Sequence, residues 1–205
     1  MKNPVRSLLI LVLAWGLIVA AISASHTLDQ VPPAAPAVVV SILTAVFAGL
    51  VLRRGTLNVG LKGLGRRPLI GFNILRIIGG ANFVWLQTQG RIPAEFAERA
   101  GWGDITVALG AAVLLLVPER PSTRPLFVLW NLVGIADLVT AVGTATWLNF
   151  TRPGAMAEIV SLPLALIPLW LVPIYLTIHL YLLRRPSPAG HPEAAQPPVH
   201  SASAA

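Results

Sequence analysis

Six long apolar stretches, separated by short polar links, make up most of this chain. They cover residues 8–22, 37–52, 69–86, 105–117, 126–150 and 159–183. A helix needs about 20 residues to cross the hydrocarbon core of a bilayer, so six crossings and their links use most of the 205 residues. The pattern predicts an all-α fold, a polytopic bundle of six transmembrane helices, with residues 1–185 forming a single membrane domain.

The composition supports this prediction. Hydrophobic residues make up 55% of the chain and charged residues 11%, which is too apolar for a soluble domain of this length. Residues 186–205 are rich in Pro, Ala and Ser and have no apolar periodicity, which predicts a disordered cytoplasmic tail. The chain has no cysteine, so disulfides, thiolate metal sites and thiol catalysis are excluded.

The basic residues are concentrated in alternate links. Eleven of the fifteen precede the first stretch, follow the sixth, or lie between the second and third or the fourth and fifth: Lys2, Arg6, Arg53, Arg54, Lys62, Arg66, Arg67, Arg120, Arg124, Arg184 and Arg185. The remaining links hold only Arg91, Arg99 and Arg152. Because basic links stay on the cytoplasmic side, we expect the N and C termini to be cytoplasmic. The net charge of +7 then lies on the cytoplasmic face, where it would contact anionic lipid headgroups, and it does not indicate nucleic-acid binding.

The first stretch allows a second interpretation. Lys2 and Arg6, an apolar run and the small residues at 23–25 also describe a secretory signal peptide. Cleavage would leave five transmembrane helices, whereas we expect the first helix to be retained.

Three segments are predicted to depart from simple helices. Residues 53–68, rich in glycine and basic residues, are expected to be a flexible cytoplasmic loop, and residues 92–103 a short amphipathic helix lying in the outer interface. In the sixth stretch Pro163, Pro168 and Pro173 interrupt backbone hydrogen bonding. They predict either a kinked, packed helix or an unwound segment that lines a cavity.

Two segments match at an offset of 33 residues. Both contain Gly-x-x-Asp-[Ile/Leu]-x-x-Ala-[Leu/Val]-Gly, beginning at Gly101 and at Gly134. Each places an aspartate, Asp104 or Asp137, on a helix face of small residues that allows close packing in lipid. The match indicates an inverted repeat of the kind found in transporters, or else it arises from coincidence or from similar packing demands on two helices.

Few ionisable groups lie inside the apolar stretches. Asp137 is twelve residues past Pro125, about 18 Å along a helix and therefore near the bilayer centre. Arg76 lies about two turns into the third helix. An unpaired charge at this depth costs about 2.5–3.5 kcal/mol on insertion scales. We therefore expect that Asp137 either pairs with Arg76 or holds a proton, and a structural ion pair and a functional site both remain open.

The other polar groups complete the candidate site. Asp104 is expected at the outer end of the fourth helix, Asn73 on the face of Arg76, and Asn131 beside Asp137 in an interhelical hydrogen bond. His179 is expected near the cytoplasmic end of the sixth helix, within reach of the interface. We predict a substrate or ion path through Asp137, Arg76, Asp104, Asn73 and Asn131, with no catalytic residue, metal site or cofactor.

One segment resembles a known sequence pattern. It covers residues 92–104 and reads Ile-Pro-Ala-Glu-Phe-Ala-Glu-Arg-Ala-Gly-Trp-Gly-Asp. It resembles the Leu-Pro-x-x-Phe-Ala-x-x-Ala-Gly-x-Gly-Asp pattern of a family of uncharacterised small bacterial multi-pass membrane proteins. Ile92 stands where Leu is usual, and the resemblance covers about residues 76–116. It implies a bacterial inner-membrane protein and no particular activity.

Three functions remain open at this point. The first is a small transporter or permease-like protein that uses the Asp/Arg polar site. The second is a non-catalytic membrane subunit or scaffold that packs against a partner protein or a second copy of itself. The third is a membrane-embedded enzyme acting on a lipid or quinone, for which the sequence offers carboxylates but no nucleophile. A connected polar cavity reaching Asp137 would favour transport, and a dry interior with a large apolar side patch would favour the scaffold.

Overall fold

The computed structural model describes residues 3–25, 32 and 35–184, and this part of the chain is helical with no strand. Its α-helices are α1 (Pro4–Ala24), α2 (Ala35–Leu52), α3 (Thr56–Leu64), α4 (Arg66–Phe72), α5 (Arg76–Thr88), α6 (Ala94–Phe96), α7 (Trp102–Leu116), α8 (Arg124–Thr151), α9 (Ala157–Val160) and α10 (Val172–Arg184). Short turns of other helix types join several of them: η2 (Asn73–Leu75), η3 (Ala97–Gly101), η4 (Pro121–Thr123) and η5 (Ile167–Leu171). The predicted all-α fold is confirmed, while the predicted tail over residues 186–205 lies outside the described residues.

Within the described ranges, five helices are long and apolar enough to cross a membrane. They are Pro4–Ala24, Arg66–Thr88, Ala94–Leu116, Pro121–Thr151 and Ile167–Arg184. A sixth crossing is present if α2 and α3, which meet at an 85° bend, count as one broken span. Length and composition therefore support a membrane protein with five or six crossings.

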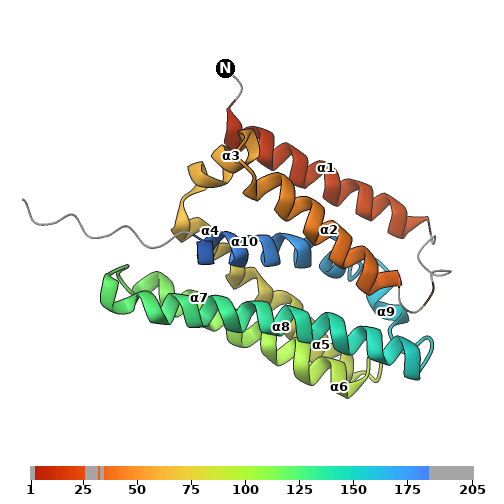
Figure 1. Ribbon diagram of the computed structural model, residues 1–205. Helices are drawn as coiled ribbons and strands as arrows, with labels where there is room; N and C mark the ends of the chain where they lie inside the picture. The colour runs from red at the N-terminus through yellow and green to blue at the C-terminus, as the bar shows by residue number, and fades with distance from the viewer. Residues whose placement is uncertain (1–2, 26–31, 33–34, 185–205) are drawn as a thin grey trace, which may run out of the picture.

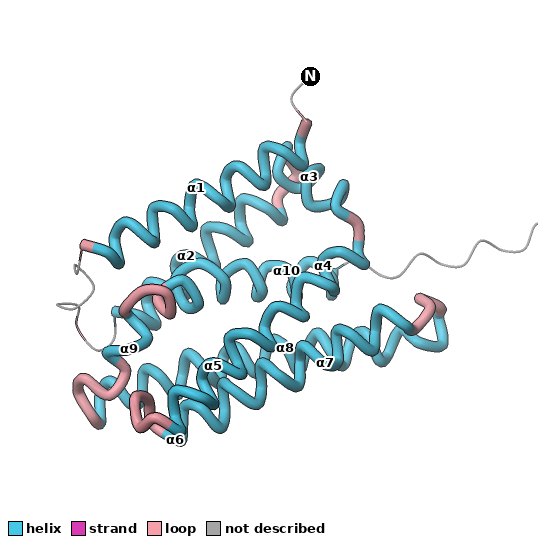
Figure 2. The backbone as a smooth tube through the Cα atoms, turned by 180° about the vertical axis from the view of Figure 1, so that it is seen from behind, coloured by secondary structure: helices cyan, strands magenta, loops and turns pink. Residues whose placement is uncertain are grey.

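Helix α10 lies in the middle of the molecule, between two groups of helices (Figures 1 and 2). It packs against α2 on one side and against α8 on the other. Helices α1, α2 and α3 form the first group, and α4, α5, α7 and α8 form the second (Figure 1). The central position of α10 means that side chains from both groups can meet along its surface.

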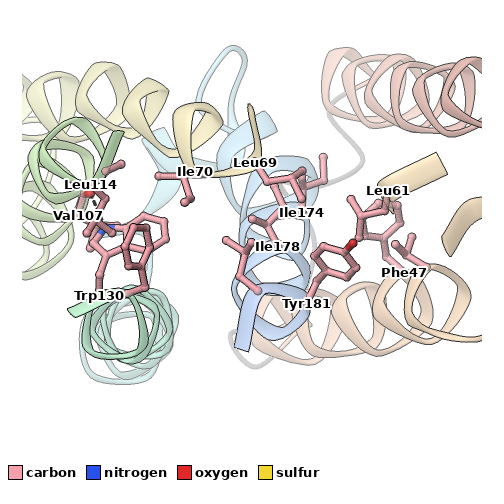
Figure 3. Close-up of a cluster of buried hydrophobic side chains, with 14 of the residues drawn as sticks. Phe47, Leu61, Leu69, Ile70, Val107, Leu114, Trp130, Ile174, Ile178 and Tyr181 are labelled. Atoms are coloured by element: carbon pink, nitrogen blue, oxygen red, sulfur yellow. Dashed lines mark hydrogen bonds between the residues drawn. The ribbon is translucent and has the colours of Figure 1, made fainter. Parts of the chain in front are cut away.

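Buried apolar side chains fill both interfaces of α10, as Figure 3 shows. Ile174 and Ile178 of α10 lie between Trp130 of α8 and Phe47 of α2. The indole Nε1 of Trp130 donates to the carbonyl oxygen of Val107, 3.0 Å away, so its one polar group is satisfied inside the core. Close packing of this kind holds helices together in lipid, where the hydrophobic effect between them is weak.

The predicted loop over residues 53–68 is wrong, because most of it is helical in α3 and the start of α4. Leu61 is 5% exposed and belongs to the same apolar cluster as Leu8 of α1, with Leu57 and Leu64 packed against it. Gly60 permits the close approach of α3 to α1, since a Cβ there would collide with the carbonyl oxygen of Pro4. The apolar face of α3 thus outweighs the low helix propensity of its glycines.

The predicted separate interfacial helix over residues 92–103 is also wrong. Helix α6, the π-helical turn η3 and α7 follow one another without a break and form the 23-residue span Ala94–Leu116. Phe96, Ala97 and Ala100 are buried in an apolar cluster that also contains Leu148 of α8. Because these residues pack inside the bundle, the segment forms the first turns of the fourth span.

The proline-rich sixth stretch is broken rather than continuously helical. Helix α9 ends at Val160, and the spanning helix begins at the π-helical turn η5 before passing into α10. Pro168 lies in η5 and lines two cavities described below. The structure shows a segment unwound at residues 161–165, and the helical residues that flank it, not the unwound residues themselves, line the cavities. The physical reason is that Pro163 and Pro168 cannot donate the backbone hydrogen bonds that a continuous helix needs.

Candidate functional site

Arg76 is held between two carboxylates, and these three side chains are called the Arg76 cluster below. Its Nε donates to Oδ1 of Asp104 at 2.6 Å, and its Nη2 donates to Oδ2 of Asp137. The Arg76 side chain is 1% exposed, that of Asp137 8% and that of Asp104 12%. The predicted approach of Arg76 to Asp137 is confirmed, and Asp104 joins the same guanidinium.

All three residues lie near the middle of their spans. Arg76 is ten residues after Arg66 and twelve before Thr88, and Asp104 is ten after Ala94 and twelve before Leu116. Asp137 lies halfway along the 28-residue α8. The expectation that Asp104 sits at the outer end of its helix is therefore wrong, because this helix begins about eleven residues earlier than the apolar pattern indicates.

Glycines bring the helices of the cluster close together. A Cβ on Gly103 of α7 would collide with Oδ1 of Asp137, so only glycine leaves room for this carboxylate. On α5, a Cβ on Gly80 would lie 2.5 Å from the carbonyl oxygen of Gly101. These contacts explain the small-residue faces of the sequence: they allow the carboxylates of α7 and α8 to reach one arginine.

The matching positions of the two sequence segments have the same role. Asp104 and Asp137 occupy equivalent places in the Gly-x-x-Asp pattern, and each binds one nitrogen of Arg76. Helices α7 and α8 follow one another in the chain, lie side by side and contact each other (Figure 1). The two matching segments therefore place their aspartates about a single positive charge.

The charges of the cluster do not balance. One guanidinium faces two carboxylates, which leaves one formal negative charge when all three groups are ionised. The guanidinium also lies over the ring of Tyr175, with Cζ 5.4 Å from the ring centroid. Among the described residues no further cation pairs with either carboxylate. An uncompensated charge in an apolar interior is costly, so the cluster is suited to hold one proton or one cation.

A cavity of about 80 Å³ adjoins the cluster. Arg76, Asp104, Gly79 and Tyr175 line its polar end, and the other lining residues are apolar. Asp137 is not among the lining residues, so the cavity reaches the cluster from the side of Asp104. A water molecule occupies about 30 Å³ in the liquid, and the cavity is therefore large enough for a few waters or a small ligand group.

A larger cavity of about 300 Å³ lies between α1, α2, α8 and the segment from α9 to η5. Its lining is almost entirely apolar, with Thr146 and Asn149 as the polar side chains. Four residues line both cavities, which are therefore neighbours: Val142, Ala145, Ile159 and Pro168. The larger cavity extends to Ile22 and Ala35, at the end of the bundle that we predict to be external.

Asn131 and His179 form a second polar contact. Nδ1 of His179 lies 3.0 Å from Oδ1 of Asn131, whose Nδ2 donates to the carbonyl oxygen of Phe127 at 2.7 Å. His179 is completely buried, so its expected reach to the interface is wrong. Gly134 makes the space for its ring, because a Cβ there would collide with Cε1 and Nε2. In the sequence, Asn131 and Gly134 lie one turn apart on α8, and this spacing is the signal that could have predicted the burial of the His179 ring.

The candidate residues thus divide into two sets. Arg76, Asp104 and Asp137 are in direct contact, whereas Asn131 binds His179 instead. Asn73 is fully buried and its Nδ2 donates to the carbonyl oxygen of Leu69 at 3.0 Å, without a bond to the cluster. Within the described ranges, no group of three or more His, Asp or Glu side chains could hold a metal ion.

The described residues form an all-helical protein with five helices long and apolar enough to cross a membrane and a buried ion-pair cluster at mid-span, features that indicate a membrane protein. The chain belongs to the family described as "Domain of unknown function (DUF8737)", whose model matches residues 36–185. This region includes Arg76, Asp104 and Asp137 as well as both cavities except for the part contributed by α1 and Ala35. No curated protein matches the chain, and no solved structure does.

Proposed function

We propose that this protein is a small transporter of the bacterial inner (plasma) membrane, in which the Arg76 cluster binds and releases a proton. The observation that carries the proposal is the placement of two carboxylates on one arginine at mid-span. A structural ion pair needs only one carboxylate. The second leaves the cluster one positive charge short, and a proton can supply that charge.

The cavities support a path to this site. The cavity of about 80 Å³ reaches Arg76 and Asp104, and the cavity of about 300 Å³ adjoins it on the side of the predicted external end. The backbone is unwound at residues 161–165, and Ile159 and Pro168, on either side of this segment, line both cavities. Intramembrane carboxylates beside cavities and broken helices are the usual features of transport sites.

Cysteine accessibility tests this proposal, because the chain has no native cysteine. Ala141 lines the cavity at the cluster, whereas Val139 is 59% exposed on the outer surface of the same helix at similar depth. In membrane vesicles, a membrane-impermeant thiol reagent should modify Ala141→Cys but not the matched control Val139→Cys, which faces lipid. Because the thiol itself ionises, the pH profile of Ala141→Cys labelling is compared with and without Asp137→Asn, and the two profiles should differ as the cluster gains or loses its proton.

The alternative functions give different outcomes. Equal, negligible labelling of both variants at all pH values would mean that water does not reach the cluster, and this would refute transport in favour of a scaffold. A pH profile of Ala141→Cys labelling that Asp137→Asn leaves unchanged would refute the role of the cluster as the proton site.

We also propose six crossings with both termini in the cytoplasm, based on the distribution of the basic residues. Lys62 on α3 and Ala157 on α9 are exposed and lie in links of opposite predicted sides. Impermeant reagent added to right-side-out vesicles should label Ala157→Cys and leave Lys62→Cys unmodified, with the opposite result in inverted vesicles. External labelling of Lys62→Cys would overturn the orientation.

A further inference from the structure

The unbalanced charge of the Arg76 cluster faces an apolar cavity, and this combination restricts the ligands it can accept. Oδ1 of Asp104 is bound to Arg76, whereas Oδ2 makes no hydrogen bond within the described part of the chain. A Cβ on Gly79 would lie 3.7 Å from this Oδ2, and Gly79 itself lines the cavity of about 80 Å³. An acceptor oxygen is therefore available at the polar end of the cavity.

The sign of the charge excludes an anionic head group. The guanidinium of Arg76 is already shared between two carboxylates and the ring of Tyr175. An anion would bring the local charge from one negative to two, whereas a cation would bring it to zero. Charge complementarity therefore selects a positively charged group that donates hydrogen bonds.

The shape and lining of the cavities select the rest of the ligand. The larger cavity of about 300 Å³ is lined by apolar side chains of α1, α2, α8 and η5, and Val142 and Ala145 separate it from the smaller one. A flexible alkyl chain can fill both spaces in sequence. Thr146, which directly follows Ala145, and Asn149, about one turn further along α8, are the polar side chains of this larger space.

We propose that the site binds a lipophilic ammonium, with the cationic head on Asp104 and the alkyl tail in the cavity between α1, α2 and α8. This substrate class rests on the proposed function, since the ammonium and the transported proton compete for the same negative charge. Binding of one ammonium ion releases one proton from the cluster, so that the net charge stays at zero in both states.

The other titratable groups around the cluster do not supply this charge. On α10, Tyr175 lies against the guanidinium and His179 is hydrogen-bonded to Asn131. On η3, Arg99 donates to Oγ1 of Thr144 at 3.4 Å instead of either aspartate. The negative charge therefore remains on Asp104 and Asp137.

The test uses the full chain in lipid nanodiscs, with empty discs as background. Titration calorimetry compares n-decylammonium with n-decanol, which has the same tail and a neutral head. We expect decylammonium to bind at least tenfold more tightly, and about one proton to be released per bound ammonium in paired buffers of different ionisation enthalpy. Asp104→Asn should abolish the proton release, and Glu98→Gln, an exposed carboxyl six residues earlier in the same span, should leave it unchanged.

A second variant covers the case in which Asp104→Asn does not fold. Ala145 lines both cavities, so the larger side chain in Ala145→Phe narrows the space that joins them. This variant should weaken decylammonium binding at least tenfold without changing the pH dependence of Ala141→Cys labelling. Equal binding of decanol and decylammonium, or ammonium binding without proton release, would overturn the inference. In either case the labelling of Ala141→Cys decides separately whether the proposed transport site is open to water.

Discussion

Removing Arg76 should destabilise the protein far more than removing either of its partners. In Arg76→Gln, Asp104 and Asp137 lose their shared cation and face each other in the bundle interior. An uncompensated charge at mid-membrane costs about 2.5–3.5 kcal/mol, and breaking a buried pair by deleting one partner costs about 3–5 kcal/mol. The loss expected for Arg76→Gln at neutral pH is therefore about 3–5 kcal/mol.

Asp137→Asn should have a much smaller effect. It leaves Arg76 paired with Asp104 at 2.6 Å, so the remaining pair is neutral, and the amide oxygen can still accept from Nη2. The expected loss is about 1 kcal/mol, the net contribution of one hydrogen bond. The triple variant Arg76→Gln/Asp104→Asn/Asp137→Asn carries no buried charge and should be more stable than Arg76→Gln alone.

Thermal unfolding in a mild detergent, at about pH 7 and about pH 5, measures these differences. At the lower pH both carboxyls of Arg76→Gln take up protons more readily, so the penalty should shrink, whereas Asp137→Asn should change little. The reasoning fails if Asp137→Asn destabilises as much as Arg76→Gln, or if the loss in Arg76→Gln is the same at both pH values.

Two further predictions concern the packing around the polar groups. Gly103→Ala should lower the unfolding temperature and disturb the cluster, because its Cβ collides with a carboxylate, while Gly143→Ala, with nothing within 4 Å, should have little effect. Equal effects of the two would contradict the close approach. Asn131→Ala removes the hydrogen bond to His179 and should cost about 1–3 kcal/mol. Asn149→Ala, on the half-exposed outer part of the same helix, is the control, and a similar loss there would argue against a specific Asn131–His179 contact.

The membrane character and the depth of Arg76 and Asp137 could be predicted from the sequence because both follow from local rules. A segment must be continuously apolar to be stable in lipid, and a helix rises about 1.5 Å per residue. Counting residues from the ends of helices that run in the same direction therefore places the two side chains at similar depth. The high cost of an isolated charge in lipid supplies the reason for them to pair.

The outcome for Asp104 shows where such counting fails. Its depth depends on where its helix begins, and residues 92–103 carry charges that are typical of an interfacial segment. Phe96 and Ala100 are nevertheless buried against residues of α8 that lie about 50 positions away in the chain. Tertiary packing thus extends the helix outward and moves Asp104 to mid-span.

The apolar stretches, the absence of thiol chemistry and the presence of buried charges were determined by the sequence alone. The tertiary structure decided which of these charges meet, that residues 56–64 fold into a helix, and that His179 is buried against Gly134. These features depend on contacts between helices that are distant in the chain, and a missing Cβ on one helix becomes meaningful only when the side chain that fills its space is known.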